Sequence, residues 1–445
     1  MHQILKATVS LLTVLAISTF CSTTVDGSPG LIRHPAAATT DLEERWSWGE
    51  NEALNGSGNG WIGYAVGLWM EPNHTFFSSG GFTLHRNGKS FRRGTPLANF
   101  LGDDLTSAAL PAINAPHPGQ VQRTVAVLLQ LDRQGQIGEA LVTDLSLPID
   151  LGGLPLAWLG SAAAEESFDL LTRLFRQTAT TRASEDVVEA VGLHDRAAAV
   201  HFLARVLEHD ERTSVREEAA EALAYQNDPE ALDILQRTVR QDQTLSVREE
   251  AVEALGESRV EGAEAVVIEL ARHVDDRRLR AEAVETLADL GTPKALETIR
   301  DLLWNDSDVD VQEEALDALA HHGPEDNGAE NTLELLIEVA RHHPKTAIRE
   351  EAVEALAEIA GDRVTRDRVV GTLEDLVNRD PSTAIREEAL DALGELADGG
   401  GIAVLAKVAS THADPRLREE ALDALAEASE DHPRARRALE MMSSY

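Results

Sequence analysis

Two adjacent histidine pairs are the residues of this 445-residue chain that most resemble metal ligands, because neutral imidazole commonly binds metals. They are His321-His322 and His342-His343. Both pairs lie where amphipathic segments end, beside Gly or Pro, and there a histidine can also interact with the C-terminal end of a helix dipole. We favour this second role. Carboxylates are abundant, but no D-x-D-x-D-G spacing predicts a calcium loop.

Sequence motifs of well-known enzyme classes are not present. The sequence contains no P-loop, Rossmann fingerprint, H-E-x-x-H or G-x-S-x-G pattern. Its only cysteine is Cys21, so neither an intrachain disulfide nor a thiolate cluster can form. We therefore expect a protein that is not an enzyme and that needs no metal or other cofactor.

The composition suits a soluble protein of two or three domains, with 43% hydrophobic and 26% charged residues. The net charge of −37 opposes binding to nucleic acid or anionic membranes, which both require a cationic surface. Acid-rich, lysine-poor surfaces also fit a salt-rich habitat. Five of the six tryptophans precede residue 160, whereas most of the excess acid lies beyond residue 180. The chain therefore has two regions of different architecture.

The N-terminus resembles an export signal. Lys6 is followed by an apolar run, Ala7–Phe20, that has the length of a signal-peptide core and is too short to span a bilayer easily. We expect residues 1–27 to be a signal peptide, cut between about 18 and 27, and residues 28–44 to be a linker. The bulky Phe20 before Cys21 disfavours lipidation. We predict a periplasmic or extracellular protein, with an N-terminal membrane anchor as the alternative.

Residues 45–150 predict a small β-rich domain. Asn55–Gly60 is a turn cluster. Trp61–Met70 and Thr75–Arg86 have the alternating, aromatic content of strands. Thr124–Asp132 and Ile137–Leu145 flank a Gly-containing connection and predict a hairpin.

The tryptophans of this first region allow two interpretations. Exposed indoles could stack on sugars, or the rings could fill a small core that has few other large side chains. We favour the core and keep carbohydrate binding as an alternative. The residues concerned are Trp46, Trp48, Trp61, Trp69 and Trp158.

A nine-residue motif repeats through the second region. It begins as Val215–Leu223 (VREEAAEAL), and its second position recurs at steps of 32, 32, 32, 37, 37 and 32 residues. Degraded copies precede it at Ala183–Val191 and, more weakly, at Leu151–Leu159. Such fixed spacing indicates a repeat architecture. The further clear copies are Val247–Leu255, Leu279–Leu287, Val311–Leu319, Ile348–Leu356, Ile385–Leu393 and Leu417–Leu425.

Each motif has helical periodicity. If its positions are numbered as slots 1 to 9, the apolar slots 1, 5, 8 and 9 share one side, and the acidic slots 3, 4 and 7 share the other. A second amphipathic segment, such as Pro229–Arg240, separates the motifs. Such hairpins bury their apolar faces only by stacking. We predict a mainly α protein: a right-handed α-solenoid over 151–445, clearest over 183–430, after the β-rich domain.

The V-R-E-E-A-x-x-A-L helix, short turn and second helix resemble HEAT repeats, in the bacterial variety called phycobilisome-lyase-like. The stretch from Ile149 to Ser167 also resembles the junction of exported bacterial HEAT proteins. The resemblance implies protein binding, with the first helices on the convex face and the second helices on the concave face. Slots 3, 4 and 7 would then form a convex stripe of 20 carboxylates, interrupted by Ala281.

Slot 2 carries an arginine in six of the seven copies, and Gln312 breaks the series. Such a residue recurs as architecture does, so we interpret it as a structural ladder whose members pair with carboxylates of the same or next repeat. The ladder consists of Arg216, Arg248, Arg280, Arg349, Arg386 and Arg418.

Four residues of the second helices form the candidate partner-binding patch. Arg240, Arg272, Trp304 and Arg341 each precede slot 2 by eight residues, so they would form a line along the inner groove. Arg and Trp are favoured at binding hot spots. In the alternative interpretation the arginines balance neighbouring acids and the indole packs in the core.

These observations favour a non-enzymatic scaffold of the cell envelope or exterior that presents its concave surface to a protein or peptide, and the net charge favours a cationic one. An enzyme of the bilin-lyase or di-iron hydroxylase type is the alternative. The hydroxylases of this repeat type bind iron through His-Glu dipeptides, and none of the 15 histidines here is followed by Glu.

Overall fold

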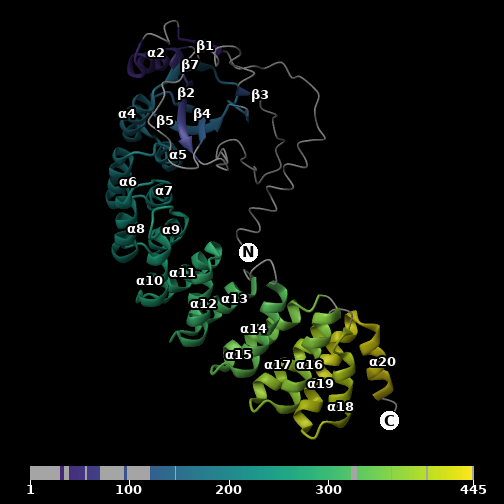
Figure 1. Cartoon of the computed structure of the whole chain (residues 1–445). Helices are drawn as coiled ribbons and strands as arrows, with labels where there is room; N and C mark the ends of the chain where they lie inside the picture. Colours follow the sequence, from purple (N-terminus) through teal and green to yellow (C-terminus); the bar gives the residue numbers. More distant parts are fainter. Residues whose placement is uncertain are drawn as a thin grey trace. The chain divides into compact units, whose positions relative to one another are not determined.

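The computed structural model describes residues 31–34, 40–55, 58–70, 95–97, 121–145, 147–321, 328–361, 363–396 and 399–442. The predicted signal peptide and the strand expected at 75–86 lie outside these ranges. The chain divides into two compact units, residues 1–194 and 195–445, called unit 1 and unit 2 (Figure 1). We describe each unit by itself.

Unit 1 is built on a mixed five-stranded sheet. Its strands lie in the order β1-β7-β2-β4-β5. β7 is parallel to both β1 and β2, whereas β4 is antiparallel to β2 and to β5. The strands are β1 (Leu31–Arg33), β2 (Gly60–Met70), β4 (Val121–Leu131), β5 (Ile137–Asp144) and β7 (Leu156–Ala162), and a separate short pair joins β3 (Thr95–Pro96) to β6 (Pro148–Ile149).

The predicted strand at 61–70 and the predicted hairpin are confirmed. β2 pairs along its whole length with β4, and β4 returns as β5. In the turn, a carboxylate oxygen of Asp132 accepts hydrogen bonds from the backbone N–H groups of Gln134 and Gln136, at 2.8 and 2.9 Å. Gly135 has a φ of +76°, a conformation that glycine adopts without strain.

Two boundaries predicted for this region are wrong. Residues 28–44 contain β1 and the start of helix α2 (Leu42–Leu54), which is capped by the side chain of Asp41, so they are not a linker. Residues 151–159 are not a weak helical repeat, because β7 runs between β1 and β2 near the middle of the sheet. Parallel pairing with strands distant in sequence decides both segments, and local periodicity carries no such information.

The first helical pair belongs to unit 1. α4 (Ala164–Leu174) is followed by a short 3₁₀ turn (Phe175–Gln177) and by α5 (Thr181–Gly192), which contains the degraded motif copy at 183–191. α5 packs on the edge strand β5. There the buried carboxylate of Asp186 accepts a hydrogen bond of 3.2 Å from the backbone N–H of Ala140. This pair is therefore joined to the sheet.

Unit 2 is a stack of helical hairpins, as predicted. The turns between helices carry capping residues before a first-turn proline, for example Asp228 before Pro229 and Thr292 before Pro293. The helices are α6 (Ala197–His209), α7 (Thr213–Ala224), α8 (Pro229–Gln241), α9 (Leu245–Glu257), α10 (Ala263–His273), α11 (Arg277–Leu290), α12 (Pro293–Asn305), α13 (Val309–His321), α14 (Gly328–His342), α15 (Thr346–Glu358), α16 (Arg363–Arg379), α17 (Thr383–Glu395), α18 (Ile402–Thr411), α19 (Pro415–Asp431) and α20 (Pro433–Met442).

The apolar slots of the motif make the core of unit 2. In α7, slots 1, 5 and 9 (Val215, Ala219 and Leu223) are fully buried. Slot 6, which the helical projection places at the edge of the apolar side, is buried in the copies from α7 to α17, as at Val252 and Leu390, and is exposed only in the last copy, at Leu422. Each hairpin therefore shares its core with its neighbours, which is the physical basis of a solenoid.

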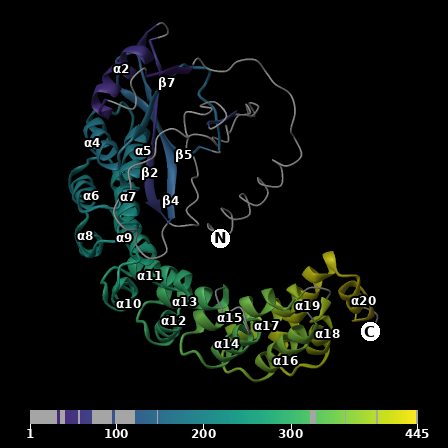
Figure 2. The ribbon, with the colours of Figure 1, turned by 45° about the horizontal axis from the view of Figure 1, so that its top comes forward.

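The helices of unit 2 form two rows. The motif helices α7, α9, α11, α13, α15, α17 and α19 make the motif row, and α6, α8, α10, α12, α14, α16 and α18 make the intervening row (Figure 2). Neighbouring motif helices pack closely, whereas neighbouring intervening helices touch little. A stack bends toward its more closely spaced row, so the motif row is the inner one. This reverses the placement implied by the resemblance, because alanines at slots 5 and 8 let the motif helices approach.

Candidate partner-binding surface

The slot-2 arginines lie between the two rows and join consecutive hairpins. Arg280 of α11 pairs with Asp306, 3.1 Å away at the end of α12, and also donates to the backbone carbonyl of Val274 at 3.0 Å. Arg216 pairs in the same way with Asp242 at 3.3 Å. The two other pairs of this kind are Arg248 with Asp276, at 3.5 Å, and Arg349 with Asp380.

In the part of the chain that the structure describes, the pairing of slot 2 with an aspartate is absent at three positions. Arg386 donates to the Ser382 carbonyl and Arg418 to the His412 carbonyl, at 3.4 and 2.7 Å. Gln312 is buried, and its side-chain oxygen lacks a hydrogen-bond partner among the described residues.

Two aromatic rings meet near the C-terminal ends of α12 and α14. The buried imidazole of His343 lies 3.0 Å, through Nε2, from the carbonyl oxygen of Leu303. The indole of Trp304 packs against the same imidazole, with 5.0 Å between ring centroids. Trp304 is therefore half-buried, with one face of the indole against this imidazole.

The three arginines of the candidate patch lie on the intervening row and are ion-paired. Each exposed guanidinium reaches a carboxylate on the next intervening helix, across 3.1 to 3.6 Å. Such exposed pairs contribute about 0–1 kcal/mol each. The patch therefore does not lie on the motif row. The pairs are Arg240 with Glu269, Arg272 with Asp301 and Arg341 with Asp375.

The histidine pairs lie at helix ends. His321 is the last residue of α13 and lies 3.0 Å from a carboxylate oxygen of Asp317. His342 ends α14, and His322 lies outside the described residues. Within the part of the chain that the structure describes, no three His, Cys, Asp or Glu side chains are grouped to hold a metal ion.

The motif row is a continuous acidic surface whose carboxylates perturb one another. Burial, and after it the neighbouring carboxylates Glu253, Glu221 and Glu217, raise the pKa of Glu250 to about 8. The same causes raise the pKa of Glu282 to about 7. Desolvation and like charges both disfavour the ionised form. The row therefore favours neutralisation by protons or by cationic groups.

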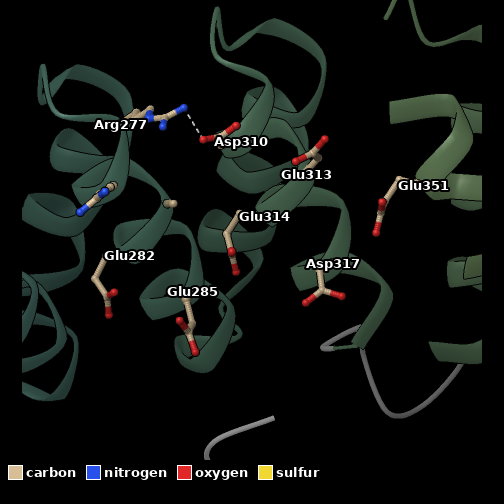
Figure 3. A pocket seen from close by; sticks show the side chains of 10 residues that line it. Arg277, Glu282, Glu285, Asp310, Glu313, Glu314, Asp317 and Glu351 are labelled. Atoms are coloured by element: carbon tan, nitrogen blue, oxygen red, sulfur yellow. Dashed lines mark ion pairs between the residues drawn. The ribbon is translucent and has the colours of Figure 1, made fainter. Parts of the chain in front are cut away.

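A hollow of about 470 Å³ interrupts this row over α11, α13 and α15 (Figure 3). Ala281 lies at its wall, where slot 3 carries a carboxylate in the other copies, so the missing side chain leaves space. An ion pair between Arg277 and Asp310 borders the hollow. The other lining residues are Arg278, Glu282, Glu285, Glu313, Glu314, Asp317 and Glu351.

Unit 1 contains a buried polar relay that the sequence analysis did not identify. The hydroxyl oxygens of Tyr64 and Ser167 are 3.0 Å apart, and Ser167 Oγ lies 3.1 Å from His194 Nε2. His194 Nδ1 lies 2.9 Å from the carbonyl oxygen of Ala190, which only accepts, so Nδ1 donates this hydrogen bond. The relay joins β2, α4 and the end of α5, and its members share no local sequence pattern.

A buried cation, Arg45, fixes helix α2 on the sheet. Nη1 of Arg45 donates to the carbonyl oxygens of Leu159 and Ser161, at 2.6 and 2.7 Å, and its guanidinium pairs with Glu166 at 3.6 Å. β7 shifts its register against β2 in this segment. Both the relay and this arginine therefore stabilise unit 1.

Three of the five N-terminal tryptophans fill the core of unit 1. Trp46, Trp61 and Trp158 are at most 4% exposed. The Trp61 Nε1–H donates to the carbonyl of Leu151 at 3.1 Å. Trp48 and Trp69 are partly exposed. This distribution fits the core interpretation of the tryptophans.

Stacked hairpins with a shared core and a repeated surface row define a helical-repeat protein. Residues 168–256, 239–320 and 370–444 match the family described as HEAT repeats, which amounts to just over half of the chain. The chain belongs to the HEAT-repeat family. No curated protein matches it. Among the described residues, no helix has both the length and the apolar character needed to cross a membrane.

The solved structures that are similar to this chain have low sequence identity to it. Human deoxyhypusine hydroxylase is 18% identical over 60% of this chain and 98% of its own, with a TM-score of 0.26. The CpcE–CpcF phycocyanin lyase complex from Nostoc sp. PCC7120 contains a chain that is 21% identical, over 55% of this chain and 94% of its own, with a TM-score of 0.26. The karyopherin Kap121p, bound to the extreme C-terminus of the phosphatase Cdc14p, is 15% identical, over 59% of this chain and 33% of its own, with a TM-score of 0.37.

Proposed function

We propose that this protein is a non-enzymatic scaffold that binds a cationic protein or peptide along the motif row of unit 2. The observation that carries this proposal is the hollow over α11, α13 and α15, where the repeat symmetry breaks at Ala281 within an acidic row. A HEAT-repeat solenoid suggests a protein-binding scaffold, and repeated side chains support the architecture. Departures from the repeat mark positions where one partner can be distinguished from another.

Charge supports a cationic partner. The hollow is lined by seven carboxylates and two arginines, one of which is paired with Asp310. Burial, and after it the neighbouring carboxylates, raise the pKa of Glu282, and a lysine or arginine entering the hollow would relieve the repulsion between these carboxylates. The net charge of −37 would also steer such a partner and repel anionic ones, with strong salt dependence.

We further propose that the protein is bacterial and is exported to the periplasm or the exterior, with the apolar N-terminal run as its signal. Cell fractionation, with mass spectrometry of the mature N-terminus, tests this part. An N-terminus between residues 18 and 28 is expected. Full-length protein in the cytoplasmic fraction would contradict export without affecting the binding proposal.

A pull-down with the mature protein at low and high salt tests the binding role. The variant Glu285→Lys/Asp317→Lys reverses two charges at the hollow, and Glu297→Lys/Glu338→Lys reverses two exposed charges of the intervening row as a matched control. We expect the hollow variant to bind the captured partner at least about tenfold more weakly, a loss of ~1.4 kcal/mol. The control should bind normally.

The same pull-down decides between the two candidate surfaces. The variant Arg240→Ala/Arg272→Ala/Trp304→Ala removes most of the patch on the intervening row. We expect this variant to retain binding. Loss of binding in the patch variant, together with normal binding by the hollow variant, would show that the motif row is not the partner surface.

A further inference from the structure

The slot-4 glutamates form a ladder of like charges across the motif row. Glu250 of α9 interacts with Glu253 and Glu257 on its own helix, one and two turns further on. It also interacts with Glu217 and Glu221 of α7, the preceding motif helix. Each step of the ladder therefore places a carboxylate against carboxylates of the adjacent hairpin.

The same arrangement recurs at the next step. Glu282 of α11 interacts with Glu285 on its own helix. On the adjacent helices it faces Glu249 and Glu253 of α9 and Glu314 of α13. The repulsion is therefore transmitted in both directions along the row.

Further along the row, the ladder continues through Glu351 and Glu388. Glu351 of α15 faces Glu313 and Asp317 of α13, besides Glu354 and Glu358 of its own helix. Glu388 of α17 faces Glu350 and Glu354 of α15, and on its own helix Asp391 and Glu395. The repulsion therefore extends over most of unit 2.

Few cations compensate this charge. Four of the six slot-2 arginines pair with aspartates at the ends of helices, as Arg216 and Arg280 do, and not with the carboxylates of the row. Among the described residues, cations that lie at the row include Arg277 and Arg278 at the hollow, and Arg416, which lies 2.8 Å from Glu387.

Tight packing holds these charges together. At Gly256 of α9, an added Cβ would lie 2.1 Å from Cγ2 of Thr286 on α11, so the two helices touch there. The alanines at slots 5 and 8 are buried as well, as Ala219 and Ala254 are. Apolar contact and carboxylate repulsion therefore act in opposite directions on one coordinate, the spacing of the motif helices.

We propose that the charge on the slot-4 carboxylates sets the spacing of the motif helices, so that neutralising or screening the ladder draws successive hairpins of unit 2 together and ionising it spreads them. Intervening helices touch little, so the row can close or open without rebuilding the outer contacts. The device operates in the free protein and does not depend on the proposed binding role.

Two glutamates of the ladder change their charge near physiological pH. Burial and neighbouring carboxylates raise the pKa of Glu250 to about 8 and that of Glu282 to about 7. The pKa values of Glu314, Glu351 and Glu388 are raised from the same causes. Glu250 and Glu282 are therefore mostly protonated at pH 5.5 and mostly ionised at pH 9.

Distance measurements by double electron–electron resonance on the full chain test the proposal. Spin labels are placed on the exposed positions of Arg205→Cys in α6 and Ala403→Cys in α18, in a Cys21→Ser background. Helices in contact are ~8–10 Å apart, and a change of about 0.5 Å at each of six steps gives a shift of about 3 Å. We expect a longer distance at pH 9 than at pH 5.5 at low ionic strength.

Two controls isolate the ladder. In Glu250→Gln/Glu282→Gln/Glu314→Gln the distance should stay short at both pH values, whereas the matched variant Glu261→Gln/Glu297→Gln/Glu338→Gln, at exposed positions outside the motif row, should respond as the wild type does. In the unsubstituted ladder, 1 M NaCl should abolish the response because the Debye length falls to about 3 Å. A distance independent of pH, or an equal response in both triple variants, would overturn the proposal.

Discussion

Replacing Glu282 by Gln is expected to stabilise unit 2 in a pH-dependent manner. Gln keeps the size of the side chain and removes the charge that faces Glu249, Glu253, Glu285 and Glu314. The pKa of Glu282 is raised from 4.5 to about 7 in the folded protein. The folded state therefore binds this proton more tightly than the unfolded state, so the stability that protonation provides is present below pH 4.5 and is lost as the pH rises through 7.

The size of the effect follows from the same shift. Each pKa unit corresponds to about 1.4 kcal/mol, which gives an upper bound of ~3.4 kcal/mol for Glu282. The carboxylate is partly exposed, and solvent screening reduces the expected gain to about 1–2 kcal/mol at pH 8.5. At pH 5, where the wild-type side chain is largely protonated, the variant and the wild type should be nearly equal.

Urea denaturation followed by circular dichroism at 222 nm measures this difference, because the helices of unit 2 dominate the signal. Glu297→Gln, at an exposed position of the intervening row, is the matched control and should change stability little at either pH. If Glu282→Gln were no more stable than the wild type at pH 8.5, or equally stabilised at both pH values, burial and the neighbouring carboxylates would not destabilise the ionised form of Glu282.

Two further predictions concern the slot-2 arginines of unit 2 and the buried polar relay of unit 1. Arg280→Ala should destabilise unit 2 by about 2–4 kcal/mol in the same urea assay, because the largely buried Asp306 loses its partner, whereas Arg240→Ala, which breaks an exposed pair, should cost less than about 1 kcal/mol. Equal losses would contradict the assignment of the slot-2 arginines to the architecture. Ser167→Ala should lower stability by about 1–3 kcal/mol, because the buried Tyr64 hydroxyl loses its hydrogen-bond partner, and a double variant with Tyr64→Phe should recover part of that loss.

Local patterns in the sequence predicted much of the fold. The motif from Val215 to Leu223 has a helical period, its apolar slots are the buried ones, and its copies recur at fixed steps. The hairpin of β4 and β5 was also evident, since alternation and a Gly-containing turn act within a few residues. Features of this kind depend on neighbours in sequence, so they can be read without the structure.

Two sites required more than local patterns. The patch of Arg240, Arg272 and Arg341 was predicted for the inner groove, whereas the structure pairs each arginine with an acid on the intervening row. The hollow at Ala281 was visible only as an interruption of the acidic stripe. Which row is the inner one depends on how closely helices of different hairpins approach, and this is set by packing over the whole stack.

The sequence by itself determined that this chain forms repeated amphipathic hairpins with one acidic face, because a periodic pattern fixes which side of each helix avoids water. Tertiary structure alone decided that β7 enters the sheet between β1 and β2, and that Tyr64, Ser167 and His194 meet in one buried relay. It also decided that the acidic face lies on the closely packed row. Strand pairing, buried hydrogen bonds and helix spacing join residues far apart in the chain, and so they follow from the packed fold and not from any local stretch of sequence.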